Sequence, residues 1–156
     1  MELQEAQALT EIHMEQYGLL QRGWRFEFDR KKTRFGVCSH GRKVIGLSKV
    51  LVELNCEEVV EKTILHEIAH AIVGYEHMHD DVWRAKAIEL GDDGEQCYKT
   101  QSQGGNVTPT AGRWKLQCRG CGFTWSKQYY SKPRRKLIHH CNGSINDIIA
   151  VRIEDI

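Results

Sequence analysis

Apolar residues recur with two different periods along the first 90 positions, which predicts a mixture of helices and strands. Residues 3–17 carry apolar side chains three or four positions apart, so we expect a helix that ends near Gly18. Residues 24–29, WRFEFD, alternate aromatic and charged side chains as a half-buried strand does. The segment RFGVCSHGRKVIGLS predicts two further short strands around a turn at 39–42.

Two more helices are predicted downstream. The first follows Asn55 and Glu58, which have capping-box spacing, and ends at Gly74. The second covers about residues 80–90 and ends at Gly91. The apolar residues of the first helix fill one broad arc of its wheel and predict a core-facing side: Val60, Ile64, Leu65, Ile68, Ala69, Ala71 and Ile72.

The charge distribution divides the chain in two. Residues 1–95 contain 18 acidic and 12 basic residues, whereas residues 96–146 contain 9 Lys or Arg and no Asp or Glu. The stretch between about 91 and 112 is rich in Gly, Ser and Thr, as linkers are. We therefore expect a main domain over 1–95 and a small basic module over 96–156.

Composition limits the class of protein. With 156 residues, 40% of them apolar, the chain suits one ordinary core and has no apolar run of the roughly 20 residues that a membrane span needs. The first 18 residues lack the basic and apolar regions of a secretory signal, so we expect an intracellular protein without a membrane partner. In a reducing compartment, six cysteines favour metal binding over disulfides.

Four of the eight histidines lie in TILHEIAHAIVGYEHMHDDVW, residues 63–83. His66 and His70 project from one face of the predicted helix, roughly opposite its apolar arc, where both can bind one ion. Glu67 lies about 100° around the helix from His66, close enough to reach a water molecule at that ion. A catalytic zinc needs a third protein ligand, and His77, His79 and Glu89 are all candidates by spacing.

ILHEIAHAIVG followed by HDDVW resembles the SprT-like metalloprotease family, which includes a protease of DNA–protein crosslinks. The resemblance implies that the third ligand is His79, because the family has a histidine in a His-Gly-x-x-Trp/Phe segment before the next helix. Here Asp80 stands in the place of that glycine. The likeness covers most of the chain and implies an α+β fold, in which a small antiparallel sheet packs with helices that carry the HExxH zinc site.

The resemblance implies a zinc endopeptidase that acts on DNA-associated or DNA-crosslinked proteins, with Zn²⁺ held by His66, His70 and His79. Glu67 would be the general base and proton carrier. A competing interpretation is a non-catalytic nucleic-acid-binding protein in which a side chain such as Glu89 or His77 closes the metal site. A third is a metallopeptidase that cleaves one specific regulator.

The basic module contains a second candidate metal site. Cys118 and Cys121 form a C-x2-C pair, and Cys141 is a third possible ligand of a structural zinc in a zinc-ribbon-like β module. Ser144 stands where a second C-x2-C pair would be completed. The fourth ligand stays open among His139, His140 and Cys97.

Basic residues surround the aromatic residues of the same module. Cations bind phosphates and aromatic rings stack on unpaired bases, so we expect this segment to bind nucleic acid, and the family resemblance implies that the nucleic acid is DNA. The candidate contacts are Lys127, Lys132, Arg134, Arg135 and Lys136.

Overall fold

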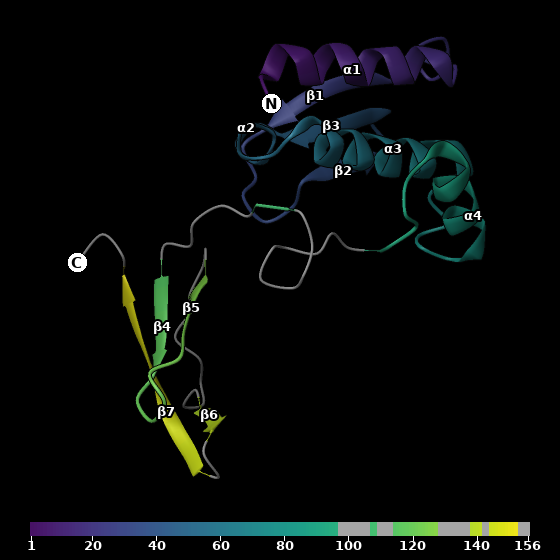
Figure 1. The fold of residues 1–156 in the computed structure, drawn as a ribbon. Helices are drawn as coiled ribbons and strands as arrows, with labels where there is room; N and C mark the ends of the chain where they lie inside the picture. The colour runs from purple at the N-terminus through teal and green to yellow at the C-terminus, as the bar shows by residue number, and fades with distance from the viewer. Residues whose placement is uncertain (97–106, 109–113, 128–137, 142–143, 153–156) are drawn as a thin grey trace. The chain divides into compact units, whose positions relative to one another are not determined.

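The computed structural model describes residues 1–96, 107–108, 114–127, 138–141 and 144–152 (Figure 1). The chain forms two compact units, Met1–Pro109 and Thr110–Ile156. The first holds α1 (Leu3–Gln16), β1 (Arg25–Asp29), β2 (Gly36–Ser39), β3 (Val44–Ser48), α2 (Lys49–Leu54), α3 (Glu57–Val73) and α4 (Asp81–Leu90). The second holds β4 (Trp114–Cys118), β5 (Thr124–Lys127), β6 (Ile138–Cys141) and β7 (Ser144–Arg152). The α+β class is confirmed.

The sheet of the first unit is mixed, with the strand order β1-β3-β2. β2 and β3 form the predicted antiparallel pair, with Cys38 opposite Ile45. β1 runs parallel to β3, with Phe26 opposite Ile45, so the expectation of a purely antiparallel sheet was wrong. The reason is topological. The chain reverses direction between β1 and β2 and again between β2 and β3, so β3, which lies between the other two strands, has the same direction as β1. All five residues of this central strand are buried.

Helices α1 and α3 contact each other and both pack against the sheet, α1 along β1 and α3 along β2 and β3 (Figure 1). The predicted apolar arc of α3 is buried at Val60, Ile64 and Ile68, and Ile72 packs against the same core. One face of α3 is thereby packed against the core, and the two histidines of the helix lie on another face.

The structure contains one helix that periodicity did not predict, α2. The hydroxyl of Ser48 accepts a hydrogen bond from the Leu51 N–H at 3.2 Å and caps this helix. Asn55 ends α2 and does not cap α3, whose N-cap is Cys56 without a side-chain hydrogen bond. The Asn55 amide instead binds the backbone of Thr108, donating to its carbonyl at 3.0 Å and accepting from its N–H at 2.6 Å.

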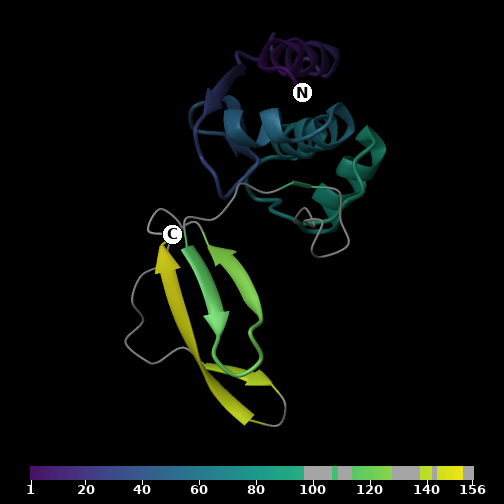
Figure 2. The ribbon, with the colours of Figure 1, turned by 60° about the vertical axis from the view of Figure 1, so that its left-hand side comes forward.

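The second unit is a small antiparallel sheet with the strand order β5-β4-β7-β6. Figure 2 shows β4 between β5 and β7. Leu116 and Cys118 on β4 are buried. The zinc-ribbon-like β module expected here is in agreement with this sheet and its cysteines.

Candidate functional site

Helix α3 and the start of α4 bring three histidines together. His66 and His70 lie one turn apart on α3, and His79 lies just before α4. The carboxylate of Asp80 caps α4 by accepting hydrogen bonds from the N–H groups of Val82 and Trp83, both at 3.0 Å. Asp80 therefore fixes the start of the helix directly after His79.

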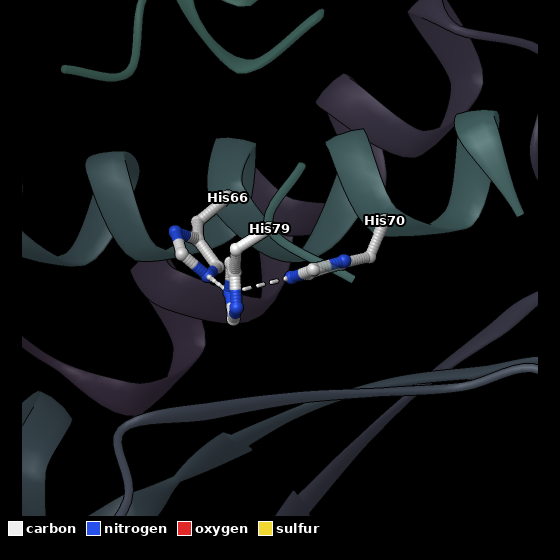
Figure 3. Close-up of side chains that lie close together, drawn as sticks. All are labelled: His66, His70 and His79. Atoms are coloured by element: carbon white, nitrogen blue, oxygen red, sulfur yellow. Dashed lines mark hydrogen bonds between the residues drawn. The ribbon is translucent and has the colours of Figure 1, made fainter. Parts of the chain in front are cut away.

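The three rings point toward a common centre (Figure 3). Nε2 of His79 lies 3.1 Å from Nε2 of His70 and 3.2 Å from Nε2 of His66. Zinc–nitrogen bonds of about 2.0–2.1 Å in a tetrahedron place two nitrogens roughly 3.3–3.4 Å apart. The arrangement fits a zinc site with three imidazole ligands.

The surroundings favour neutral imidazoles, the form that binds metal. Burial, with the nearby His66 and His79 rings, lowers the pKa of His70 to about 4. Burial also lowers the pKa of His79, and His66 adds to the effect. At neutral pH, both rings thus offer a nitrogen lone pair.

The Trp83 ring packs against one side of the histidine cluster. Its ring is fully buried, and its centroid lies 4.6 Å from that of His66, 5.1 Å from that of His70 and 4.5 Å from that of His79. The His70 and Trp83 rings are stacked, with 21° between their planes. Trp83 restricts the rotation of all three imidazoles, which favours a preformed site.

Asp92 is a part of the site that sequence reasoning missed. Its Oδ2 lies 3.2 Å from Nδ1 of His66, and the Asp92 side chain is only 5% exposed. The carboxylate accepts the Nδ1–H, which leaves the Nε2 of His66 with its lone pair toward the cluster. The sequence signal was weak, because Asp92 lies in GDDGE, where any acid could be solvated.

Glu67 is buried between α3 and the edge strand β2, with 8% of its surface exposed. Burial raises the pKa of Glu67 to about 7, against the lowering effects of His66, Arg34 and a hydrogen bond to the Cys38 backbone. Gly36 makes room for the carboxylate, since a Cβ at that position would lie 2.6 Å from its Oε1. Glu67 is held beside the histidines in a state that exchanges protons near neutral pH.

The structure does not bring the other two candidate ligands into the cluster. The ring of His77 pairs with the Asp80 carboxylate at 2.8 Å, and the backbone of His77 hydrogen-bonds the His70 ring. The Glu89 carboxylate pairs with the Lys86 ammonium at 2.6 Å. Of the three candidates left open by spacing, only His79 lies with His66 and His70.

The second unit brings Cys118, Cys121 and Cys141 together, with their sulfurs within 4.8 Å of one another. The Sγ atoms of Cys118 and Cys141 are 3.7 Å apart, and the Gly120 N–H donates to Cys118 Sγ at 3.4 Å. Three thiolates and a tight turn suit a structural zinc. His139 and His140 lie on β6, and the structure describes only their backbone, whereas Cys97 lies outside the described residues.

The predicted nucleic-acid contacts lie at the limits of the described chain. Lys127 ends β5, and only its backbone is described. Lys132, Arg134, Arg135 and Lys136 lie outside the described residues.

None of the helices described is both long enough and apolar enough to cross a bilayer.

Comparison with known proteins identifies the family of the chain. No curated protein matches the chain. The model of the SprT-like family matches residues 6–103, a range that includes α3, the histidine cluster and Asp92. Because this match covers more than half of the 156 residues, the chain belongs to the SprT-like family.

Proposed function

We propose that this protein is a zinc-dependent endopeptidase that hydrolyses proteins associated with DNA or crosslinked to it. One observation carries the proposal: the Nε2 atoms of His66, His70 and His79 converge, with distances of 3.1 and 3.2 Å from that of His79, beside the buried carboxylate of Glu67. Membership of the SprT-like family supports a metallopeptidase type of enzyme.

His66, His70 and His79 would hold the zinc ion, and their donor set fits it. When bound, zinc would supply Lewis-acid chemistry by polarising the scissile carbonyl group and acidifying a water molecule. Glu67 takes the proton of the attacking water and delivers it to the nitrogen of the leaving amine. Its carboxylate suits both steps, because burial places its pKa near neutrality.

Several neighbours keep these groups in place. Asp92 fixes the tautomer of His66, and the Trp83 ring packs against all three imidazoles. Gly36 lets Glu67 lie flat against β2. A preorganised site of this kind lowers the cost of reaching the reactive geometry.

The preference for DNA-associated substrates is supported by charge. Residues 96–146 carry nine basic and no acidic residues, among them Lys127, Lys132 and the Arg134–Lys136 run. A second, structural zinc on Cys118, Cys121 and Cys141 would stabilise the module that presents them. We expect the protein to act inside the cell, where these cysteines stay reduced.

The competing function, a non-catalytic nucleic-acid-binding protein, requires a protein ligand at the fourth metal position. The candidates for that role, His77 and Glu89, are paired with Asp80 and Lys86 instead. This observation favours the enzyme.

The test is an incubation with a DNA-bound protein substrate, with and without DNA and with and without a chelator. We expect cleavage by the wild-type protein, none after chelation, and none by Glu67→Gln although that variant keeps its zinc. His66→Ala should lose both zinc and cleavage. Undiminished cleavage by the glutamine variant would refute the role of Glu67, and cleavage unaffected by DNA would refute the substrate class.

A further inference from the structure

The first unit contains an acid-free basic stretch of its own. Residues 30–52 carry seven Lys or Arg and no Asp or Glu, whereas the other positions of residues 1–95 carry 18 acidic and five basic residues. Four of the seven lie within RKKTR, residues 30–34, which is the loop between β1 and β2. Positive charge is thus concentrated in one stretch of the sequence, in a unit that is otherwise acidic.

The structure fixes the backbone of this loop. The Asp29 carboxylate accepts from the Lys31 N–H at 2.8 Å and from the guanidinium of Arg34. The hydroxyl of Ser48, at the end of β3, donates to the Lys31 carbonyl. These contacts hold the loop at the end of the sheet where α2 begins, as Figure 1 shows.

Two of the four cations of this loop, Arg30 and Lys31, are exposed and have no ion pair among the described residues. Six basic side chains of the described unit form ion pairs: Arg25, Arg34, Arg42, Lys62, Arg84 and Lys86. Arg30 and Lys31 are exposed, and neither side chain pairs with a carboxylate of the residues described. The unit contains more carboxylates than cations, yet Arg30 and Lys31 pair with none of the carboxylates described. Both cations are therefore accessible to an external anion.

The loop also adjoins the candidate catalytic residue. It leads directly into β2, whose Gly36 packs against the Glu67 carboxylate. The Arg34 guanidinium is close enough to lower the pKa of Glu67. The end of the loop at Arg34 therefore adjoins the groups proposed to cleave protein.

We infer that the loop of residues 30–34 is a second nucleic-acid contact, which binds the phosphate backbone next to the metal site. A nucleic acid fits better than an isolated anion, because the chain has two separate acid-free basic stretches, 30–52 and 96–146, that one long polyanion can bind together. The inference extends the proposed function, since it uses the same partner, but it concerns a different surface.

The experiment compares three full-length variants that each lose two positive charges. The first is Arg30→Gln with Lys31→Gln. The matched control is Lys62→Gln with Lys86→Gln, since these two cations already pair with Glu58 and Glu89. The third is Arg134→Gln with Arg135→Gln, in the basic module. Binding to a labelled 30-nucleotide single strand, and to its duplex, is measured over a series of salt concentrations.

If both loop cations contact phosphates, the negative slope of log affinity against log salt concentration becomes shallower by about one to two in the loop variant. Its affinity at 0.15 M salt should drop roughly ten-fold. The control variant should keep the wild-type slope. A loop variant that matches the control overturns the inference while leaving the role of the basic module intact. Loss in the loop variant alone supports the inference and refutes localisation by Arg134 and Arg135.

A polyglutamate peptide of equal charge serves as the competitor. Nucleic-acid binding predicts that it competes far less well than unlabelled oligonucleotide. Equal competition would identify an acidic protein segment as the partner and overturn the inference. Cleavage of a DNA-free unfolded protein substrate, measured in parallel, should be the same for the loop variant and the control, which separates this result from any failure of the proposed enzyme.

Discussion

Nδ1 of His66 lies 3.2 Å from Oδ2 of Asp92, and this contact joins the metal-facing helix α3 to the turn that follows α4. The Asp92 N–H in turn donates to the Ala87 carbonyl at 2.9 Å, so the carboxylate is fixed by the end of α4. An ionised carboxylate can only accept the hydrogen bond, which requires the proton of His66 to be on Nδ1. The Nε2 lone pair is therefore directed at the cluster before any metal arrives.

We predict that Asp92→Asn weakens zinc binding by about 10- to 100-fold, the usual effect of losing a carboxylate behind a histidine ligand. The amide keeps the shape of the side chain but removes the charge that holds the tautomer. The measurement is competition against a chromophoric chelator. Asp93→Asn is the matched control, because the neighbouring Asp93 is exposed and its carboxylate accepts a hydrogen bond from the Glu95 N–H at 3.0 Å. Equal affinity for the two variants would contradict the role of Asp92.

The sequence predicted those elements that local periodicity determines. Helices α1 and α4 begin and end within one residue of the expected positions, and α3 ends as predicted before Gly74. The short helix α2 was missed, because KVLVEL spans fewer than two turns and shows no clear period. The wrong assignment of Asn55 as a cap has a long-range cause: its amide binds Thr108, 53 residues away.

Tertiary relationships were beyond a single sequence. The parallel pairing of β1 and β3 depends on β3 lying between its neighbours, which no local pattern encodes. The place of Asp92 depends on a contact across 26 residues. Spacing left the choice among His77, His79 and Glu89 open, and the resemblance to the family, not the periodicity, singled out His79. The structure then placed only His79 near the other two histidines.

Gly36→Ala is predicted to displace Glu67. The added Cβ would lie 2.6 Å from Oε1 and 2.7 Å from Cγ of Glu67, and 2.9 Å from Cγ2 of Thr63. Because overpacking typically costs about 1–3 kcal/mol, we expect a loss of stability in that range together with a large loss of proteolysis. Zinc affinity should change little, since no histidine is touched.

The matched control is Gly41→Ala in the turn between β2 and β3, where an added Cβ meets nothing within 4 Å. This variant should keep both stability and activity. Full activity in Gly36→Ala would show that Glu67 need not lie against β2.

Cys38 is predicted to be almost inert toward thiol reagents. Burial raises the pKa of Cys38 to about 12, and the charge of Glu67 adds to the effect. Only the thiolate reacts, so at pH 8 we expect Cys38 to be modified at least about 100-fold more slowly than the exposed Cys56. Peptide mapping by mass spectrometry after timed alkylation measures both rates in one sample. Cys56 is exposed at the start of α3, where it is the N-cap. Similar rates for the two cysteines would contradict the raised pKa of the half-buried Cys38 thiol.

Glu67 is predicted to make the metal-free protein less stable as pH rises. Its pKa of about 7 in the folded protein exceeds the ordinary value of 4.5, so between these two values the folded state binds more protons than the unfolded state. Stability is therefore lost as pH rises through this window. His70 acts in the opposite sense, because its lowered pKa makes the folded state lose stability as pH falls below 6.5.

A comparison with Glu67→Gln isolates the carboxylate, because His70 is common to both proteins. Relative to wild type, the chelator-treated variant should gain about 2–3 kcal/mol between pH 5 and pH 8 in urea unfolding followed by tryptophan fluorescence. The control is Glu57→Gln, which makes the same substitution at an exposed position in the first turn of α3. A difference between wild type and Glu67→Gln that stays constant from pH 5 to pH 8 would mean that Glu67 is already ionised in the folded protein. His66, Arg34 and the hydrogen bond to the Cys38 backbone would then outweigh burial, and the raised pKa of Glu67 would be refuted.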